Sequence, residues 1–351
     1  MKIDDLVGRI GEWLSAAGPM SDIVISTRVR LARNIAGYPF LSKASPEARD
    51  ELADLLKRGI HAAAREQKWT YIDITRSGEL DRQILVERHL ISRQHADSDG
   101  SRGVAVSPTE TVALMVNEED HLRMQSIRSG LQLDEVWDEI NRIDDQLEER
   151  FEYAYHARYG YLTACPTNVG TGMRLSVMLH LPGLKLTNEI EKVLRAARDL
   201  KLAVRGLYGE GTEATGDFFQ ISNQTTLGRS EPEIIHEFKN EILPRVLEYE
   251  TQARRALVRD RLPALDDKIW RSFGTLQNAR SISSEETLAH LSHLRMGIHL
   301  GRFAELDLKV LNELFLLTQP AHLQKLAGNK LSGEDRSVAR ADYIRKRLSR
   351  N

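Results

Sequence analysis

The stretch Asn117-Glu118-Glu119-Asp120-His121-Leu122-Arg123 follows directly on the apolar run Thr111–Val116. It gathers three carboxylates, an imidazole and a guanidinium where an apolar segment ends, a pattern typical of a strand that delivers polar side chains to a site. A second apolar run, Gly103–Ser107, precedes it across Pro108-Thr109-Glu110. This connection is too short for a helical crossover, so we predict that the two runs pair as an antiparallel hairpin.

Similar patterns continue along the chain. Two further antiparallel hairpins are predicted, Tyr159–Ala164 with Met173–Leu181, and Leu202–Leu207 with Asp217–Ser222. Apolar residues recur at helical spacing in Glu47–Gln67, Asp134–Glu149, Pro232–Arg259, Ser284–Leu300, Leu306–Leu317 and Gly333–Arg347. From about Glu231 onward the strand patterns end. We therefore predict an α+β protein, in which an antiparallel sheet flanked by helices is followed by an all-helical C-terminal domain.

The composition limits the class of protein. A chain of 351 residues, 41% of them hydrophobic, can bury a large core. We divide it into a short N-terminal extension (1–20), a domain containing the sheet (21–252) and the helical C-terminal domain (253–351). The single cysteine, Cys165, excludes an intrachain disulfide. With no apolar run near the roughly 20 residues of a membrane span, no signal peptide and a net charge of −2, we expect a cytoplasmic protein that binds neither membranes nor nucleic acids directly.

Arginines mark the candidate site. Five of them lie at or beside the predicted strand ends: Arg28, Arg30, Arg123, Arg174 and Arg205. Guanidinium groups stay charged and bind phosphate oxygens in bidentate fashion, so the set suits a triphosphate, although any one alone reads as an ordinary surface residue. The chain has neither a P-loop nor the H-R-D and D-F-G elements of hydroxyl-directed protein kinases. Phosphoryl transfer would therefore rest on arginines and on Mg²⁺ carried by the nucleotide, with no metal held by protein side chains.

The phosphate acceptor is indicated by Glu119. A guanidinium is a poor nucleophile because its lone pairs are delocalised and it is protonated, so a carboxylate must orient it and accept a proton. A planar cation favours two carboxylates, and Glu210, in the loop of the third predicted hairpin, is the natural second one. A solvated acidic turn is the alternative for either glutamate taken alone.

Three segments resemble motifs of the phosphagen (guanidino) kinases: Asn117–Arg123, Ser26–Arg30 and Cys165–Arg174. The resemblance spans about Ser21–Leu247 and implies an ATP-dependent catalytic domain with Glu119 as the catalytic carboxylate. It also implies that Glu210 and Cys165 line the guanidino pocket, where the cysteine tunes substrate binding. The nucleotide contacts that it implies are Ser26, Thr27, Arg28, Val29, Arg30, His89, Arg123, Arg174, Leu175, Ser176, Val177, Met178, Arg205, Gly206, Leu207, Tyr208, Gly209 and Glu210. For His89 the matching segment is short, and a surface histidine fits equally well.

The chain differs from animal arginine and creatine kinases in two ways, and these differences indicate which branch of the family it resembles. Animal arginine and creatine kinases carry a helical domain ahead of the first motif, whereas here only residues 1–20 precede it, so we expect a more open pocket. Met178 stands where those enzymes have a nucleotide-side histidine, and a helical module follows the catalytic domain. This arrangement is similar to the bacterial protein-arginine kinases. It implies phosphorylation of arginine side chains in proteins, marking them for a Clp ATPase and protease.

The resemblance to the protein-arginine kinases also implies partners. They are a zinc-binding activator protein of the McsA type, a transcriptional repressor as a substrate, and a second copy of the chain in a homodimer. Two alternatives stay open. One is a small-molecule guanidino kinase that acts on free arginine, and the other is a non-catalytic adaptor that binds phosphoarginine.

A C-terminal segment resembles the phosphoarginine-binding motif Arg-Asp-x-x-Arg-Ala of the same kinases. It aligns with Arg336–Ala341, where Ser337 replaces the aspartate. Arg336 and Arg340 would clamp a phosphorylated side chain, while the acceptor for its guanidino part is lost. The alternative is a basic, solvated terminal helix with no ligand.

Overall fold

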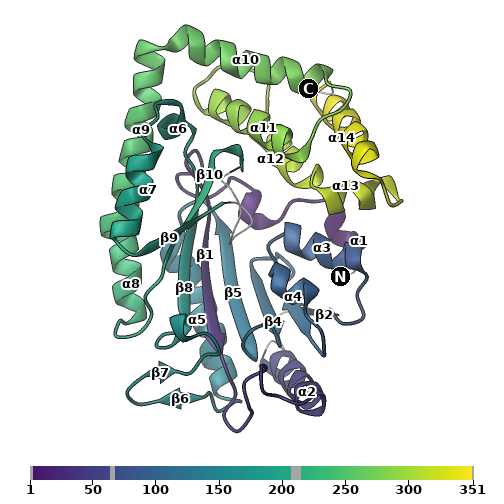
Figure 1. Cartoon of the computed structure of the whole chain (residues 1–351), viewed down its shortest axis with the longest axis vertical. Coiled ribbons are helices and arrows are strands. Elements are labelled where there is room, and N and C mark those ends of the chain that lie inside the picture. Colours follow the sequence, from purple (N-terminus) through teal and green to yellow (C-terminus); the bar gives the residue numbers. More distant parts are fainter. Residues whose placement is uncertain (1–2, 64–67, 207–214, 350–351) are drawn as a thin grey trace.

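A central antiparallel sheet organises the chain. The computed structural model describes residues 3–63, 68–206 and 215–349, which contain an eight-stranded sheet with the order β2-β3-β4-β5-β1-β8-β10-β9 (Figure 1). Its strands are β1 Val24–Arg33, β2 Thr70–Asp73, β3 Gly103–Val106, β4 Val112–Val116, β5 Leu122–Ser129, β8 Met173–His180, β9 Leu202–Arg205 and β10 Phe218–Asn223. A separate two-stranded sheet pairs β6 Tyr155–His156 with β7 Gly160–Tyr161.

One face of the sheet is apolar and covered by helices. In β1, Val29 and Leu31 are fully buried in the main hydrophobic core, whereas Arg28 and Arg30, which alternate with them, point to the other face. The helices that contribute to this core are α2 Pro46–Ala63, α5 Leu133–Glu148, α6 Pro182–Leu186, α7 Ile190–Asp199, α8 Glu231–Glu237 and α9 Leu243–Asp260. The second face is therefore left to polar side chains along the central strands.

Two short helices cover β3 and β4 on the polar face. These are α3 Glu79–Glu87 and α4 Arg93–Asp97, which pack with Val104, Val106 and Met115 in a second core. Ahead of β1 the chain forms α1 Asp4–Val7 and the 3-10 turn η1 Glu12–Leu14. The side chain of Trp13, in η1, is 2% exposed and packs near the sheet.

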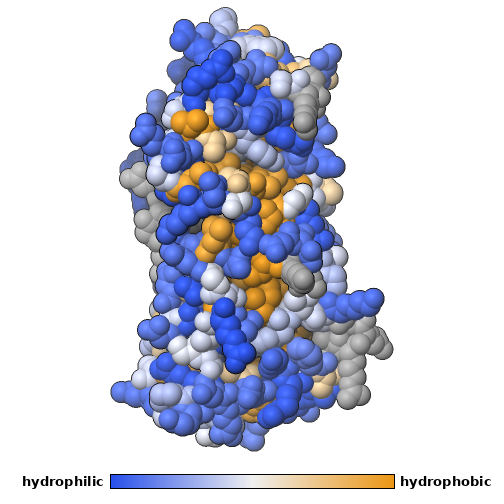
Figure 2. All heavy atoms as spheres, turned by 90° about the vertical axis from the view of Figure 1, so that its right-hand side faces the viewer, coloured by the Kyte–Doolittle hydropathy of each residue, from blue (hydrophilic) through white to orange (hydrophobic). Residues whose placement is uncertain are grey.

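The C-terminal module is helical and lies over one end of the sheet (Figure 1). It consists of α10 Leu262–Asn278, α11 Ser284–His299, α12 Leu308–Leu317, α13 Pro320–Ala327 and α14 Gly333–Leu348. Its apolar side chains form one cluster with Trp13, Ile25, Met178 and Phe218. Figure 2 shows the side of the molecule on which α13, α14, α1 and α3 lie, where apolar side chains run along the middle of the face between hydrophilic borders. The module is thus joined to the sheet by a packed apolar contact.

Most of the predicted pattern is confirmed. The hairpin β3–β4 and the pairing of β9 with β10 are present, as are the helices predicted around α2, α5, α11, α12 and α14. The segment predicted as one helix from Pro232 to Arg259 is divided into α8 and α9 by a π-helical turn, Phe238–Ile242. An antiparallel sheet with flanking helices and a helical C-terminal region confirms the predicted fold class. No helix among the described residues is long and apolar enough to cross a bilayer.

One predicted hairpin is wrong. Met173–Leu181 contains β8, but β8 pairs with β1 and β10, and Tyr159–Ala164 contributes only β7 of the small second sheet. Strand β1, which no hairpin pattern had indicated, occupies the position predicted for Tyr159–Ala164 because its apolar residues match the buried face of β8. The predicted boundary near Gln252 lies within the continuous helix α9, and the division into domains stays a prediction.

Candidate active site

The Asn117–Arg123 stretch forms the tight turn between β4 and β5. The Asn117 N–H donates to the His121 carbonyl at 2.9 Å, and Asn117 adopts a positive φ of 58° that asparagine tolerates better than most residues. Its side-chain amide donates to the carbonyls of Arg49 and Ser101, both at 2.9 Å. The turn is therefore fixed to α2 and to the start of β3, and its carboxylates have defined positions.

Glu118 holds Arg123 in place. Its Oε2 atom accepts from Arg123 Nη1 at 2.6 Å, and its Oε1 atom accepts from the Ser92 hydroxyl at 2.5 Å. Burial opposes ionisation of Glu118, but the charge of Arg123 and these hydrogen bonds lower its pKa overall. The neighbouring acids in turn raise the pKa of Arg123 despite its burial. Glu118 is thus a charged positioning group for an arginine of the site.

Asp120 and His121 are internal braces of the turn. Asp120 Oδ1 accepts from the Asn34 side-chain amide and from the Ala164 N–H, both at 2.7 Å. His121 Nδ1 accepts from the Ile35 N–H at 2.9 Å, and its other ring nitrogen donates to the Pro39 carbonyl. Both side chains are fully buried, so neither is available to a substrate.

Glu119 is the exposed carboxylate of this turn. Its side chain is 32% exposed, against 1% for Glu118, and its Oε2 atom lies 3.8 Å from Arg123 Nη1. A carboxylate that reaches solvent beside an arginine-rich surface can meet a substrate guanidinium and take a proton from it. The geometry therefore distinguishes Glu119 from the two other acids of the motif.

The β-sheet register brings the predicted arginines to one face. Directly opposite residues of an antiparallel pair point to the same side. Arg30 of β1 lies opposite Arg174 of β8, and Arg123 of β5 lies opposite Ala32, two residues further along β1. Arg28 shares this face because it lies two residues before Arg30. The interior position of Arg28 and Arg30 corrects the expectation that all five arginines lie at strand ends.

The fifth arginine joins the same face through β10. Arg205 lies opposite Gln220, and Gln220 lies opposite Met178 of β8. Gln220 also accepts a hydrogen bond from Arg28 Nη2 at 3.0 Å. The face therefore continues from β5 to β9 as one surface.

The arginines of this face carry charges that repel each other. Burial and the charges of Arg123, Arg174 and Arg205 lower the pKa of Arg28 to about 10. Burial and like charges also lower the pKa of Arg30 well below its ordinary value. The Arg30 Nε atom is buried and has no hydrogen-bond partner among the described residues. Such a surface is stabilised by a polyanion that neutralises it.

A small pocket lies beside the arginines. It is lined by Trp13, Ser26, Arg28, His89, Ile127, Ser176, Met178 and Gln220, which include five of the residues predicted to contact the nucleotide. The His89 ring meets Trp13 edge-on with 4.7 Å between the ring centroids. Burial and the nearby Arg28 and Arg93 lower the pKa of His89 to about 3, so its imidazole is neutral at pH 7. The enclosed space is only about 10 Å³, so the pocket in this form does not enclose a nucleotide base. Its aromatic edge offers a stacking surface beside the cationic face.

Some residues predicted to contact the nucleotide have side chains that do not lie on the arginine face. The side chains of Val29, Leu175 and Val177 are buried in the core on the opposite face, and the Thr27 hydroxyl donates to the Gly130 carbonyl at 2.7 Å. These four side chains cannot reach a ligand on the arginine face, because successive residues of a strand point to opposite sides. Gly206 directly follows β9. The predicted residues Leu207, Tyr208, Gly209 and Glu210 lie outside the described residues.

Cys165 lies in a loop that is tied to the Glu119 turn. Its Sγ atom is 3.0 Å from the Thr167 hydroxyl, and its thiol is free. The Ala164 N–H, next to it, donates to Asp120, and the Asn34 amide bridges Asp120 to the Leu162 carbonyl. Asp120 therefore sets the distance between the cysteine loop and the exposed carboxylate.

We expect the Asp120→Ala variant to lower kcat/KM for a protein substrate about tenfold and the free energy of unfolding by about 2 kcal/mol, since two hydrogen bonds to a buried carboxylate are lost. Asp120→Asn is the matched control. It keeps the accepting Oδ1 atom and changes only Oδ2, which has no partner among the described residues. Steady-state kinetics measure kcat/KM, and urea unfolding measures the free energy of unfolding. If Asp120→Asn lost as much of either quantity as Asp120→Ala, the role given to Oδ1 would be contradicted.

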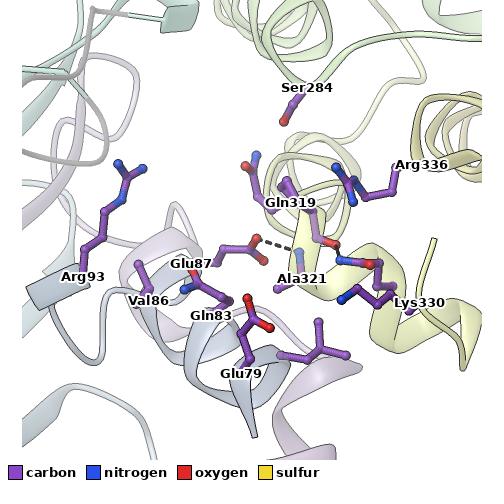
Figure 3. Close-up of a pocket in the computed structure, with 13 residues that line it drawn as sticks. Glu79, Gln83, Val86, Glu87, Arg93, Ser284, Gln319, Ala321, Lys330 and Arg336 are labelled. Atoms are coloured by element: carbon purple, nitrogen blue, oxygen red, sulfur yellow. Dashed lines mark hydrogen bonds between the residues drawn. The ribbon is translucent and has the colours of Figure 1, made fainter. Parts of the chain in front are cut away.

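The two C-terminal arginines have different surroundings. Arg336 lines a cavity of about 540 Å³ with Glu79, Arg93 and Lys330, as Figure 3 shows. Arg340 is 3% exposed, and its Nε and Nη1 atoms donate to the carbonyls of Thr318 and Ile282. Arg340 thus anchors α14 to its neighbours and does not line the cavity, and the clamp formed by both arginines stays a prediction.

Three residues of the pocket, Trp13, Ile127 and Gln220, were absent from the sequence prediction. Gln220 is indicated only by the alternation of polar and apolar residues in Phe218–Asn223, which places its side chain on the face opposite Phe219 and Ile221. Trp13 lies outside every recognised motif and reaches the pocket through packing on the C-terminal module. No local sequence signal identifies Trp13.

Comparisons with known proteins show the family of this chain. Residues 51–253 match the family model of the ATP:guanido phosphotransferase C-terminal catalytic domain, and residues 263–351 match that of the protein-arginine kinase McsB C-terminal domain. The protein-arginine kinase of Halothermothrix orenii is 44% identical over 99% of this chain and 100% of its own length. That of Symbiobacterium thermophilum is 46% identical over 99% of both chains.

Solved structures show the same fold. A duplicated taurocyamine kinase from Schistosoma mansoni, solved with transition-state analogue components, is 29% identical with a TM-score of 0.61 and is matched over 70% of this chain and 35% of its own. A lombricine kinase is 26% identical with a TM-score of 0.57, over 72% of this chain and 71% of its own. With the arginine face, the Glu119 turn and full-length relatives in agreement, this chain belongs to the ATP:guanido phosphotransferase family and, within it, to the protein-arginine kinases.

Proposed function

We propose that this chain transfers the γ-phosphate of ATP to the guanidino group of arginine residues in proteins. The observation that carries the proposal is the face of five arginines, on which Arg28 and Arg30 have pKa values lowered by burial and by neighbouring like charges. Such a face favours a bound triphosphate. Glu119 is proposed to meet the incoming guanidinium, supported by its exposure and by the 3.8 Å between its Oε2 atom and Arg123 Nη1.

Each group has a part in the proposed transfer. A guanidino nitrogen of the substrate attacks the γ-phosphorus in line, the bond to the bridging oxygen of ADP breaks, and Glu119 accepts the proton that the nitrogen loses. Arg28, Arg30, Arg123, Arg174 and Arg205 neutralise the phosphate oxygens, and Mg²⁺ arrives with the nucleotide to share this role. Glu210 is proposed to orient the guanidinium and Cys165 to line its pocket.

The nucleotide base is proposed to stack against the aromatic edge of the pocket beside Arg28. Its support is the aromatic pair of Trp13 and His89 and the apolar side chain of Met178. The division into the extension 1–20, the catalytic domain 21–252 and the C-terminal domain 253–351 is retained as a proposal. It is supported by the separate matches of residues 51–253 and 263–351.

The acid lability of the product tests the activity. We expect casein incubated with the protein and Mg-ATP to carry phosphate that acid removes, because a phosphoramidate hydrolyses in acid whereas a phosphoester resists it. Phosphorus NMR of the same samples identifies the P–N bond, and free arginine is assayed in parallel. Label on free arginine alone would replace the proposal by a small-molecule guanidino kinase. Absence of label on both, with the activator protein added, would favour a non-catalytic adaptor.

Further roles follow from membership of the protein-arginine kinases. We propose that phosphorylated substrates are passed to a Clp ATPase and protease, that a transcriptional repressor is among them, and that a zinc-binding protein activates the kinase. We also propose a cytoplasmic homodimer. A phosphoarginine site in the C-terminal domain is proposed at Arg336 and Arg340, supported by the cavity that Arg336 lines with Lys330 and Glu79.

A further inference from the structure

The N-terminus of α13 is held by a side chain from outside the C-terminal module. The N–H groups of Ala321 and His322 donate to Glu87 Oε1 and Oε2 at 2.7 and 3.0 Å, and the first of these bonds is drawn in Figure 3. Gln319, at the N-cap position, provides no side-chain cap. A carboxylate is the favoured partner of the unsatisfied N–H groups at a helix N-terminus. Glu87, at the end of α3, therefore caps a helix 234 positions away in the sequence.

The imidazole of His322 extends this contact. Its Nδ1 atom lies 2.7 Å from Glu87 Oε2, and its Nε2 atom lies 3.3 Å from Arg88 Nη1. Because arginine only donates, Nε2 accepts, so Nδ1 carries the hydrogen and donates to Glu87. Arg88 is fully buried and also donates twice to Glu110, at 2.7 and 2.9 Å. Glu87 and Arg88 are thus both fixed by partners distant in the chain.

The next residue, His89, belongs to the proposed nucleotide pocket. It has a φ of 58°, a left-handed conformation that costs energy for a residue with a Cβ and persists where its neighbours enforce it. Its carbonyl accepts from the Gln125 side chain at 2.5 Å, and its ring packs against Trp13. The His89 backbone is therefore held by Gln125 and its ring by Trp13, immediately after the two residues that are fixed against α13.

The opposite wall of the pocket also depends on the C-terminal module. Trp13, Ile127 and Met178 line the pocket and share an apolar cluster with Phe315 of α12 and Ile344 of α14. The Asn312 side chain donates to the Leu14 carbonyl at 2.7 Å, which fixes the turn that carries Trp13. A shift of the C-terminal module would thus move both His89 and Trp13, which line the pocket.

We propose that Glu87 is a positioning residue for the nucleotide, which couples the C-terminal module to the base pocket by fixing Arg88 and His89. The proposal rests on the proposed function, in which the base of ATP stacks against the edge of this pocket formed by His89 and Trp13. Glu87 lines the cavity that contains Arg336 and belongs neither to the arginine face nor to the Glu119 turn, so we expect its loss to change nucleotide affinity and to leave the chemical step intact.

Steady-state kinetics of the full chain test this role. We expect Glu87→Ala to raise KM for ATP about tenfold, with kcat and KM for casein within about twofold of the wild-type values, since tenfold in affinity corresponds to one lost charged contact. Glu87→Gln keeps one accepting oxygen and should give an intermediate KM. Hydrogen exchange at the amides of residues 88–90 should be slowest in the wild type, faster in Glu87→Gln and fastest in Glu87→Ala. This measurement reports directly on the strained segment.

Lys325→Ala is the matched control. Lys325, also on α13, pairs with Asp4 and Asp81 at 2.8 Å each, at the same junction but without contact to Arg88 or His89. Its KM for ATP should stay unchanged. An equal rise in Lys325→Ala, or an unchanged KM in folded Glu87→Ala and Glu87→Gln, overturns the proposal. A wild-type chain without kinase activity would overturn the proposed function instead, and calorimetric ATP affinities of the same variants would still decide the coupling.

Discussion

Replacement of Glu119 by alanine is expected to reduce phosphoryl transfer to protein arginine about 10³-fold, the range lost when a positioned general base is removed. The affinity for ATP should stay within about twofold, because Glu119 is an exposed acid at the edge of the arginine face and Glu118 alone makes the close ion pair with Arg123. Single-turnover phosphorylation of casein measures the first quantity, and isothermal calorimetry with Mg-ATP measures the second.

Glu119→Gln is the matched variant for this experiment. It retains the size and hydrogen-bonding shape of the side chain but cannot accept the proton, so its transfer rate should fall nearly as far as that of Glu119→Ala. Activity of either variant close to that of the wild type would refute the assignment of Glu119 as base. A loss of ATP affinity equal to the loss of rate would indicate that the turn had collapsed.

Replacement of Arg30 by methionine is expected to lower kcat/KM for ATP by about 10² to 10³, because one preorganised charge on the transferring phosphate is removed. The melting temperature should be unchanged or higher. Burial and the charges of Arg28, Arg123 and Arg174 all lower the pKa of Arg30, so the substitution relieves repulsion in the unliganded protein. Opposite effects on activity and stability are the signature of a charge retained for a ligand.

Arg128→Met provides the control on the adjacent strand. Arg128 of β5 lies opposite Thr27, on the other face of the sheet, and pairs with Glu139 of α5 at 3.1 Å. Its removal should leave the calorimetric affinity for ATP within about twofold. Unchanged ATP affinity in Arg30→Met, or a loss of stability larger than that of Arg128→Met, would contradict the proposed phosphate role of Arg30.

The sequence identifies residues whose chemistry depends on a local motif. The Asn117–Arg123 stretch predicts a strand end rich in carboxylates, and the structure forms the turn between β4 and β5 at that position. The β3–β4 hairpin follows from two short apolar runs and a connection too short for a helix. The helices α2, α5 and α14 follow from their periodicity. These features depend on neighbours in the chain, so a single sequence is sufficient to predict them.

Other features depend on which strand lies beside which. Nothing within Tyr159–Ala164 indicates that it forms only a two-residue strand, since the partner of β8 is β1, which is remote in the sequence. The same pairing moves Arg28 and Arg30 from predicted strand ends to the middle of a sheet face and turns Val29, Leu175 and Val177 into core residues. A strand pattern gives two faces but does not specify which one meets solvent.

The sequence by itself thus determined the family motifs, the carboxylate proposed to face the substrate and the set of arginines proposed to bind phosphate. Only the tertiary structure decided that Glu118 and Asp120 are braces, that Trp13 meets His89, and that Glu87 caps α13 across more than two hundred positions. The physical reason is that side-chain chemistry is local, whereas burial, charge repulsion and capping depend on groups that only folding brings together.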